Sequence, residues 1–295
     1  MAGIFALQFP NGFLRRFQSL NARPEQAAPV PENDEKLIPS KVELVQFLEK
    51  FCHLSYQTIP IGVTDAARPL LLDLADPQPG PILVLGDEGR GNTDLLKVLA
   101  HSACANQSSQ EIKFLVISSQ PGEWKSWLGS LQKPERCLAI LEKDSSDVGD
   151  WIIQLAEQVE QRFNCRHSSA PILLLIDGLN FINRAESDVQ LNFEWLCHNA
   201  PGVQVWPVAT LPTVMALEMG SWIRHFHTRL IGKMPNRSAI RLGLSSGLDS
   251  EGLVAGRQFA VRIQEEWINF WLPVTLSTSR VLETGPNKEI KEVER

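Results

Sequence analysis

The chain has 295 residues, 43% of them hydrophobic, which is enough to bury one large core or two smaller ones. Its formal net charge of −6 at pH 7 argues against a domain that grips duplex DNA through an overall basic surface, and favours a protein partner over DNA. Its five widely spaced cysteines form no C-x-x-C pair, so we expect reduced thiols in a cytoplasmic protein. We expect no membrane span, because no apolar run approaches about 20 residues.

The amino-terminal part is expected to be an arm followed by one helix. Residues 1–40 should form a flexible arm and linker, because 21–39 hold four prolines and many charges. Apolar residues recur at helical spacing after Lys41, so we expect a helix within 41–58. The main domain should span 59–282, and the charged segment 283–295 should be a frayed tail.

From residue 59 onward the pattern changes to strands and helices. Residues 59–63 and 69–76 predict a short hairpin-like pair, and from Pro81 apolar runs alternate with helical stretches. Runs without polar alternation are typical of strands covered on both faces, so the alternation predicts an α/β fold with a mostly parallel sheet flanked by helices. The expected strands are 81–86, 112–117, 137–141, 171–177 and 203–209, and the expected helices are 92–105, 123–131, 148–163 and 189–199.

The chain after residue 211 has shorter elements. We expect one helix over 214–226, because its apolar residues recur at helical spacing. Four short strands are expected after it, at 228–233, 239–244, 257–263 and 267–272.

Residues 86–93, GDEGRGNT, which we call the glycine loop, follow the first apolar strand and precede a helix. Gly86, Gly89 and Gly91 would let backbone N–H groups approach phosphates closely, and Thr93 could ligate magnesium. Asn92 stands where a phosphate-binding loop has its lysine, so the cation is missing unless Arg90 folds inward.

Two further features of the glycine loop bear on phosphate. Asp87 and Glu88 place carboxylates in it, and a charge about 4 Å away counts for about 4 kcal/mol at an effective dielectric near 20. They should therefore lower affinity for phosphate. The alternative is a glycine-rich turn between strand and helix that never meets a nucleotide.

A second acidic element is the strand PILLLID, which ends in Asp177. An apolar strand ending in Asp is typical of the carboxylate that supports magnesium, so Thr93 and Asp177 would be the metal ligands if a nucleotide is bound. Taken alone, Asp177 could equally cap a turn. Gly178 follows it, where a hydrolysing motor usually has the glutamate that polarises water.

Several motifs in order resemble the FtsK/SpoIIIE branch of the HerA/FtsK P-loop ATPases. Asp73 and Leu74 precede the glycine loop as in that branch, IIQLAEQVEQRF resembles its helix that ends in Arg and an aromatic residue, and VATLP resembles its sensing strand. Thr210 matches the sensor position, but Leu211 replaces a glutamine. The resemblance covers roughly residues 59–273 and implies a RecA-like P-loop NTPase core, ring assembly, and motors that pull DNA or feed secretion substrates.

The departures at Asn92, Gly178 and Leu211 fall on one reaction path, so we expect a degenerate, non-hydrolysing domain. Such a domain would serve as a structural or regulatory subunit, or as an interaction module, of a motor or secretion assembly. Two alternatives stay open. One is an active or slow ATP-dependent translocase of DNA or protein, and the other is a protein that holds ATP or ADP with magnesium without turnover.

Two other clusters of side chains could carry a function. Basic residues after the sensing strand, Arg224 and Arg229 among them, could supply an arginine to a neighbouring subunit of a ring, or could be solvated charges. His198, His225 and His227 lack an obvious helical metal pair and no Glu or Cys stands at ligand spacing, so we expect ordinary histidines and not a zinc site.

Overall fold

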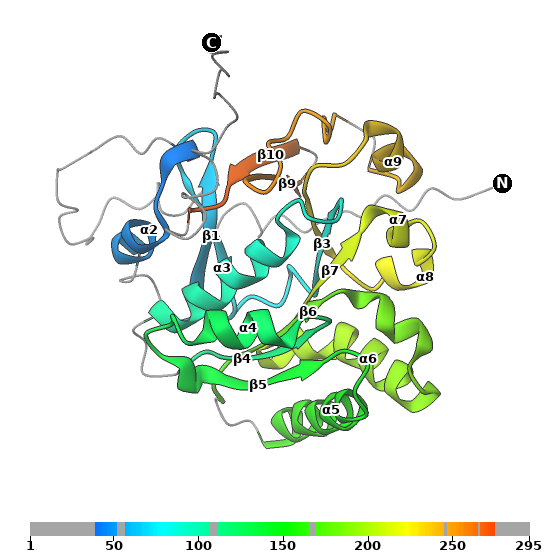
Figure 1. Ribbon diagram of the computed structural model, residues 1–295. Coiled ribbons are helices and arrows are strands. Elements are labelled where there is room, and N and C mark those ends of the chain that lie inside the picture. The colour runs from blue at the N-terminus through cyan, green and yellow to red at the C-terminus, as the bar shows by residue number, and fades with distance from the viewer. Residues whose placement is uncertain are drawn as a thin grey trace, which may run out of the picture.

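The computed structural model describes residues 39–51, 57–106, 111–165, 169–244, 247–264 and 266–274 (Figure 1). Most of the predicted arm 1–40 and the whole predicted tail 283–295 lie outside the described residues. Among the described helices, none is both long enough and apolar enough to cross a membrane.

One ten-stranded sheet organises the described chain. Its strands are β1 (Thr58–Thr64), β2 (Pro69–Asp73), β3 (Ile82–Gly86), β4 (Lys113–Ser118), β5 (Cys137–Glu142), β6 (Ile172–Asp177), β7 (Val205–Pro212), β8 (Thr228–Ile231), β9 (Gln258–Ile263) and β10 (Glu266–Trp271). The strand order is β2-β1-β10-β9-β8-β3-β7-β6-β4-β5. From β8 to β5 neighbouring strands are parallel, whereas β9, β10, β1 and β2 pair antiparallel. The mostly parallel α/β sheet predicted from the sequence is confirmed, with an antiparallel extension on one side.

Helices cover both faces of the sheet (Figure 1). They are α2 (Leu44–Phe51), α3 (Asn92–Ala105), α4 (Pro121–Leu128), α5 (Asp147–Cys165), α6 (Ser187–Asn199), α7 (Thr213–Ala216), α8 (Gly220–Ile223) and α9 (Asn236–Arg241). Short 3-10 turns, η2 (Pro39–Lys41), η3 (Pro134–Arg136), η4 (Leu179–Arg184) and η5 (Ala200–Val203), complete the connections.

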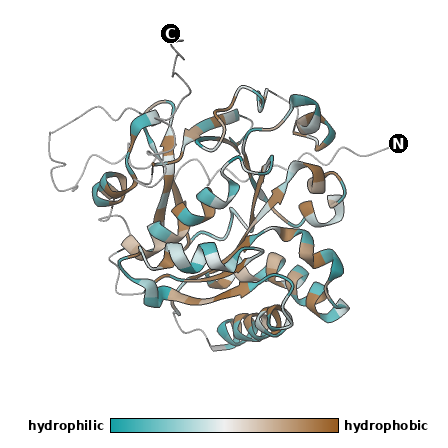
Figure 2. Ribbon diagram, viewed as in Figure 1, coloured by the Kyte–Doolittle hydropathy of each residue, from teal (hydrophilic) through white to brown (hydrophobic). Residues whose placement is uncertain are grey.

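The central strand β3 shows why the apolar runs are continuous. Ile82 and Val84 pack in a core with α3 and α4, whereas Leu83 and Leu85 pack on the other face in a core with α5, α6, α7 and α8. Successive side chains of a strand point to opposite faces, so a strand covered on both sides must be apolar throughout. The brown strands between mixed helices in Figure 2 follow this rule.

Most predicted elements are confirmed. The antiparallel pair β1 and β2 forms the expected hairpin, the five strands from β3 to β7 overlap their predicted ranges, and α3 spans the predicted 92–105. The thiols Cys104, Cys137 and Cys197 are free, as expected.

Two expectations for the carboxyl-terminal part are wrong. The helix predicted over 214–226 is split into α7 and α8, because the chain turns at Met219 so that both this side chain and Trp222 reach the core. Residues 239–244, predicted as a strand, belong to α9 and its end. Gly243, at φ +74°, closes that helix, and Leu244 N–H donates to Ala239 O at 2.9 Å, which is a Schellman motif.

His101 on α3 provides a pH-dependent test of this packing. Its ring lies edge-on to Trp127 of α4, at 5.0 Å between centroids, and burial lowers the pKa of His101 from 6.5 to about 4. The folded state thus keeps this imidazole neutral while the unfolded chain protonates it, so stability is lost as pH falls from 6.5 towards 4. Relative to His101→Phe, wild type should lose roughly 1–3 kcal/mol of unfolding free energy between pH 7 and 4.

Urea unfolding followed by tryptophan fluorescence at several pH values measures this difference. The carboxylates titrate alike in both proteins, so their contribution cancels. Parallel pH profiles for the two proteins would contradict a buried, neutral His101.

Candidate functional site

The residues singled out in the sequence meet at the carboxyl edge of the parallel strands. Gly86 ends β3 and is in register with Pro212 of β7, while Asp177 ends β6 in register with Ser118 of β4. The glycine loop runs from the end of β3 into α3, and Thr93 is the second residue of that helix. The parallel register therefore places Thr93, Asp177 and Thr210 around one point, as in the predicted site.

The Asp177 carboxylate lies at the centre of a hydrogen-bond network. Thr93 Oγ1 donates to Asp177 Oδ1 at 2.8 Å, and Thr210 Oγ1 donates to the same oxygen at 3.3 Å. On the other oxygen, Oδ2, Trp124 Nε1 donates at 3.1 Å and Ser118 Oγ at 3.2 Å. A carboxylate has about four lone-pair positions that can accept hydrogen bonds. The four neutral donors of the protein therefore occupy all of them.

The second predicted metal ligand, Thr93, belongs to the same hydrogen-bond network. Its hydroxyl proton is directed to Asp177, and the hydroxyl of Thr210 accepts a 2.9 Å hydrogen bond from Gly178 N–H while it donates to the carboxylate. Gly178 adopts φ +104°, which favours glycine and gives a turn without a side chain at the position of the expected glutamate.

Asn92 does not take over the role of a loop lysine. Its side chain folds back to the base of the loop, where Nδ2 donates to Gly86 O at 3.1 Å. The residue is only 9% exposed, and its Oδ1 has no hydrogen-bond partner within the protein. A neutral amide in this position carries no charge to the phosphate side of the loop.

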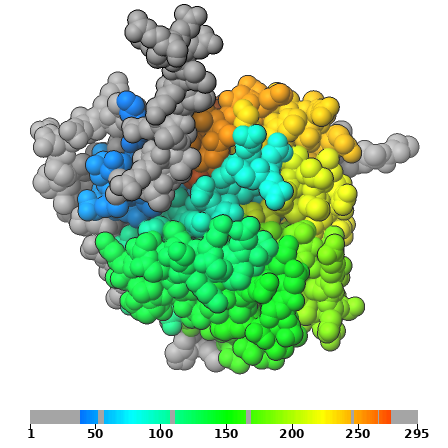
Figure 3. Space-filling model, viewed as in Figure 1, coloured from blue at the N-terminus to red at the C-terminus, as the bar shows by residue number. Residues whose placement is uncertain are grey.

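The glycine loop is covered by a second glycine turn that precedes β9. Gly256 N–H donates to Arg90 O at 3.0 Å, and a Cβ on Gly91 would lie 2.5 Å from Gly256 Cα. Gly91 itself has φ +90°. Backbone therefore packs directly on backbone here, and Figure 3 shows the cyan loop segment at the surface beside the orange segment that precedes β9.

The side chain of Lys233, a cation near the glycine loop, also bonds to backbone carbonyl oxygens. Lys233 Nζ donates to the carbonyl oxygens of Glu251 at 2.6 Å and Leu253 at 3.1 Å, and its own carbonyl accepts from Asp87 N–H at 3.0 Å. Lys233 thus ties the loop to the segment that leads to Gly256. Arg90, the predicted substitute cation, is exposed.

The predicted trans arginines lie elsewhere. Arg229 is in β8, in register with Leu83 of β3, and Arg224 is exposed in the segment that leads into β8. Arg224 therefore lies at the amino edge of the parallel strands, opposite the glycine loop. A role in a neighbouring subunit stays a prediction.

Sequence reasoning missed two of the four donors to Asp177. Ser118 carried a signal, since a polar residue ends the apolar run of β4 at the same edge as Asp177. Trp124 carried none, because only the packing of α4 against α3 and the sheet brings its indole N–H to the carboxylate.

No known protein family and no curated protein matches the chain in sequence. Solved structures do match it. Thermomonospora curvata EccC, ATPases 2 and 3 in complex with a signal sequence peptide, has 13% identity and a TM-score of 0.60, over 81% of this chain and 44% of that chain. The cytoplasmic domain of EssC has 12% identity and a TM-score of 0.61, over 89% of this chain and 51% of that chain. The pCW3 conjugation coupling protein TcpA, in its monomer form with ATPγS, has 12% identity and a TM-score of 0.62, over 80% of this chain and 70% of that chain.

The chain has the fold of the RecA-like P-loop ATPases. It spans about half or less of the length of the EccC and EssC structures, and identities of this size establish shared architecture alone. The glycine loop lies between the central strand β3 and helix α3.

The contact between the glycine loop and Gly256 predicts a difference between two glycines. Gly91→Ala should lower the free energy of unfolding by about 2–4 kcal/mol, because the new methyl group overlaps Gly256 at a positive φ. Gly89→Ala is the matched control, since φ is +69° but nothing lies within 4 Å of the new Cβ, and it should cost about 1 kcal/mol. Urea denaturation measures both, and equal losses would contradict the packing of Gly256 on the loop.

The network predicts that Asp177 stabilises the fold without magnesium. Asp177→Asn should cost about 2–4 kcal/mol of unfolding free energy in the presence of EDTA, because the new amide NH₂ faces groups that are themselves donors. Asp76→Asn is the control, since Asp76 accepts one hydrogen bond from Gln78 N–H, and it should cost less than about 1 kcal/mol. If Asp177→Asn were neutral or stabilising without metal, the carboxylate would be held for a cation instead.

Proposed function

We propose that this chain is a degenerate member of the FtsK/SpoIIIE branch that does not hydrolyse nucleotide. We propose that it acts as a structural or regulatory subunit, or as an interaction module, of a motor or secretion assembly. The observation that carries the proposal is the Asp177 carboxylate, whose two oxygens accept hydrogen bonds from four neutral protein donors.

The residues at this edge do not suit a magnesium nucleotide. A metal at Asp177 would have to displace a hydroxyl or an indole that already satisfies the carboxylate, and Thr93 would have to leave the same network. Phosphoryl transfer also needs cations on the oxygens that gain charge. Asn92 is neutral and folded back, and Lys233 is bound to backbone carbonyl oxygens.

An interaction role is supported by apolar side chains around the carboxyl edge. Val214 on α7 is 70% exposed and Ile240 on α9 is 61% exposed, and Met215 and Val254 are exposed as well. Helix α7 follows the end of β7 and α9 follows the end of β8, so both lie at the edge that carries the glycine loop, on one side of the molecule in Figure 1. Exposed apolar side chains gathered on neighbouring elements are typical of protein interfaces.

The similar structures agree with such a setting. They include a type VII secretion ATPase and a conjugation coupling protein, and one EccC structure is in complex with a signal sequence peptide. We propose a protein partner of that kind, because the net charge of −6 favours a protein over DNA. We also propose a cytoplasmic location, because the cysteines form no C-x-x-C pair and are expected to be reduced.

Titration calorimetry with ATP and ADP in the presence of magnesium tests the proposal. Wild type should show no binding up to about 1 mM nucleotide, equivalent to a binding free energy weaker than about −4 kcal/mol. Asn92→Lys adds the cation at the loop, while Asn92→Ala removes the same amide without adding charge. Only Asn92→Lys should gain measurable affinity, because a lysine there neutralises phosphate oxygens.

Other outcomes would decide against the proposal. Micromolar binding by wild type would favour a nucleotide-holding protein, and slow decay of the bound ATP would favour the slow translocase. In that second case Arg90→Ala should abolish turnover, since Arg90 is the exposed cation of the loop.

A further inference from the structure

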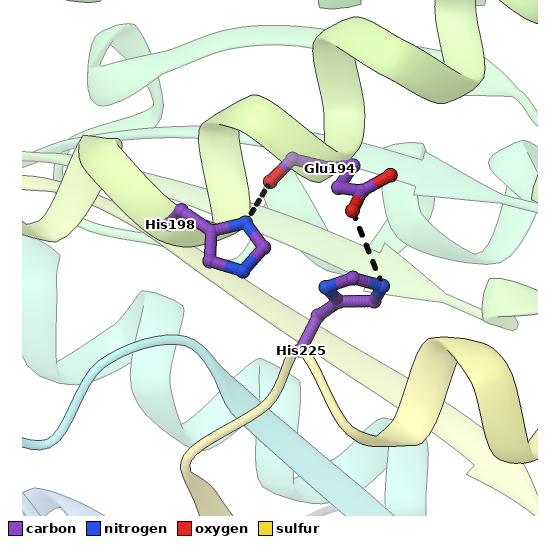
Figure 4. Close-up of side chains that lie close together, drawn as sticks. All are labelled: Glu194, His198 and His225. Atoms are coloured by element: carbon purple, nitrogen blue, oxygen red, sulfur yellow. Dashed lines mark hydrogen bonds and ion pairs between the residues drawn. The ribbon is translucent and has the colours of Figure 1, made fainter.

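A second group of functional side chains lies at the opposite edge of the sheet. Glu194 and His198 are one turn apart on α6, and His225 lies between α8 and β8. The three side chains point toward one another in Figure 4, and their possible ligand atoms all lie within 4.8 Å of one another. The expectation that no glutamate stands at ligand spacing beside these histidines is wrong, because Glu194 precedes His198 by four residues and shares its helix face.

The hydrogen bond of His198 leaves one ring nitrogen available. Nδ1 lies 2.8 Å from the backbone carbonyl oxygen of Glu194. A carbonyl oxygen has no proton to give, so in the neutral ring Nδ1 carries the N–H and Nε2 has the lone pair. A histidine whose second nitrogen donates to a backbone carbonyl is the usual arrangement of a metal ligand, because the hydrogen bond fixes both the tautomer and the ring orientation.

His225 is held in place without an optimal polar partner. Its Nε2 lies 3.8 Å from Glu194 Oε1, which is too far for a hydrogen bond, and its ring is edge-on to that of His198 at 5.1 Å between centroids. The residue is 9% exposed and also packs against Trp222. Burial lowers the pKa of His225, and the neighbouring Glu194 carboxylate opposes this shift.

A cavity of about 290 Å³ adjoins the cluster. His198, His227, Asn199 and Gln78 are among its lining residues. Two imidazole nitrogens and one carboxylate oxygen suit Zn²⁺, whereas magnesium and calcium prefer oxygen ligands alone. Three protein ligands leave a fourth coordination position for water, and the cavity reaches the cluster at His198.

We propose that Glu194, His198 and His225 form a Zn²⁺ site at the amino edge of the sheet, with the fourth position open to the adjoining cavity. Ligand atoms around a tetrahedral zinc lie about 3.4 Å apart, given bonds of about 2.1 Å, so the cluster must contract on binding. The Glu194 side chain is 47% exposed and can rotate to close this distance. The zinc ion would join α6 to the segment that leads into β8.

Calorimetry of the metal-free full chain with Zn²⁺ tests the site. Wild type should bind one zinc ion per chain with a dissociation constant of about 10 µM or lower, and zinc should raise its melting temperature. His198→Gln and His225→Gln should each weaken binding at least about tenfold, and Glu194→Gln should weaken it similarly while it keeps the backbone carbonyl. Co²⁺ should give the visible absorption of a tetrahedral complex in wild type only, and Mg²⁺ should not compete.

His227→Gln is the matched control. His227 lines the cavity two residues after His225 but is exposed and lies outside the ligand set, so zinc affinity should stay within about threefold. Melting curves without metal show whether each variant is folded. The proposal is overturned if wild type binds no zinc at 100 µM (about ten times the expected dissociation constant), if folded His198→Gln and His225→Gln bind it like wild type, or if His227→Gln loses it.

Discussion

The hydrogen bonds of the Asp177 carboxylate hold the carboxyl edge of the sheet together. Their donors come from α3, β4, α4 and β7, so one charged group at the end of β6 joins four other elements. Asp177 is half-buried, and every acceptor position of its carboxylate has a protein donor. The positions of α3 and α4 on this edge therefore depend on one residue, Asp177.

The glycine loop is likewise held by contacts within the protein. Without a lysine, the side chain at position 92 bonds the base of the loop, and the backbone of Gly256 packs where Gly91 leaves room. Lys233 links the loop to the chain that leads to Gly256 through backbone carbonyl oxygens. Polar groups of the loop and of Lys233 therefore contact the protein itself, and these internal hydrogen bonds hold the loop in place.

The two edges of the parallel strands thus differ in character. At the carboxyl edge, four protein donors satisfy the Asp177 carboxylate, and exposed apolar side chains lie on α7 and α9. The amino edge carries imidazole and carboxylate groups whose lone pairs are not all used. Groups with unused coordinating capacity can bind a further ligand, and in this fold they lie at the edge opposite the glycine loop.

The local sequence pattern was enough to predict the strands from β3 to β7 and helix α3, because strand periodicity depends only on nearby residues. It also predicted that Gly86, Thr93 and Asp177 lie at one edge of the sheet, because the order of parallel strands follows general rules of sheet topology. The local pattern gave a wrong prediction at Met219, where the chain turns because long-range packing overrides helical periodicity. It also gave a wrong prediction for 239–244, although Gly243 marked a helix end. Trp124 reaching Asp177, Gly256 covering Gly91 and His225 meeting Glu194 each join segments far apart in sequence. Such contacts are decided by how helices pack on the sheet, and no local pattern contains that information.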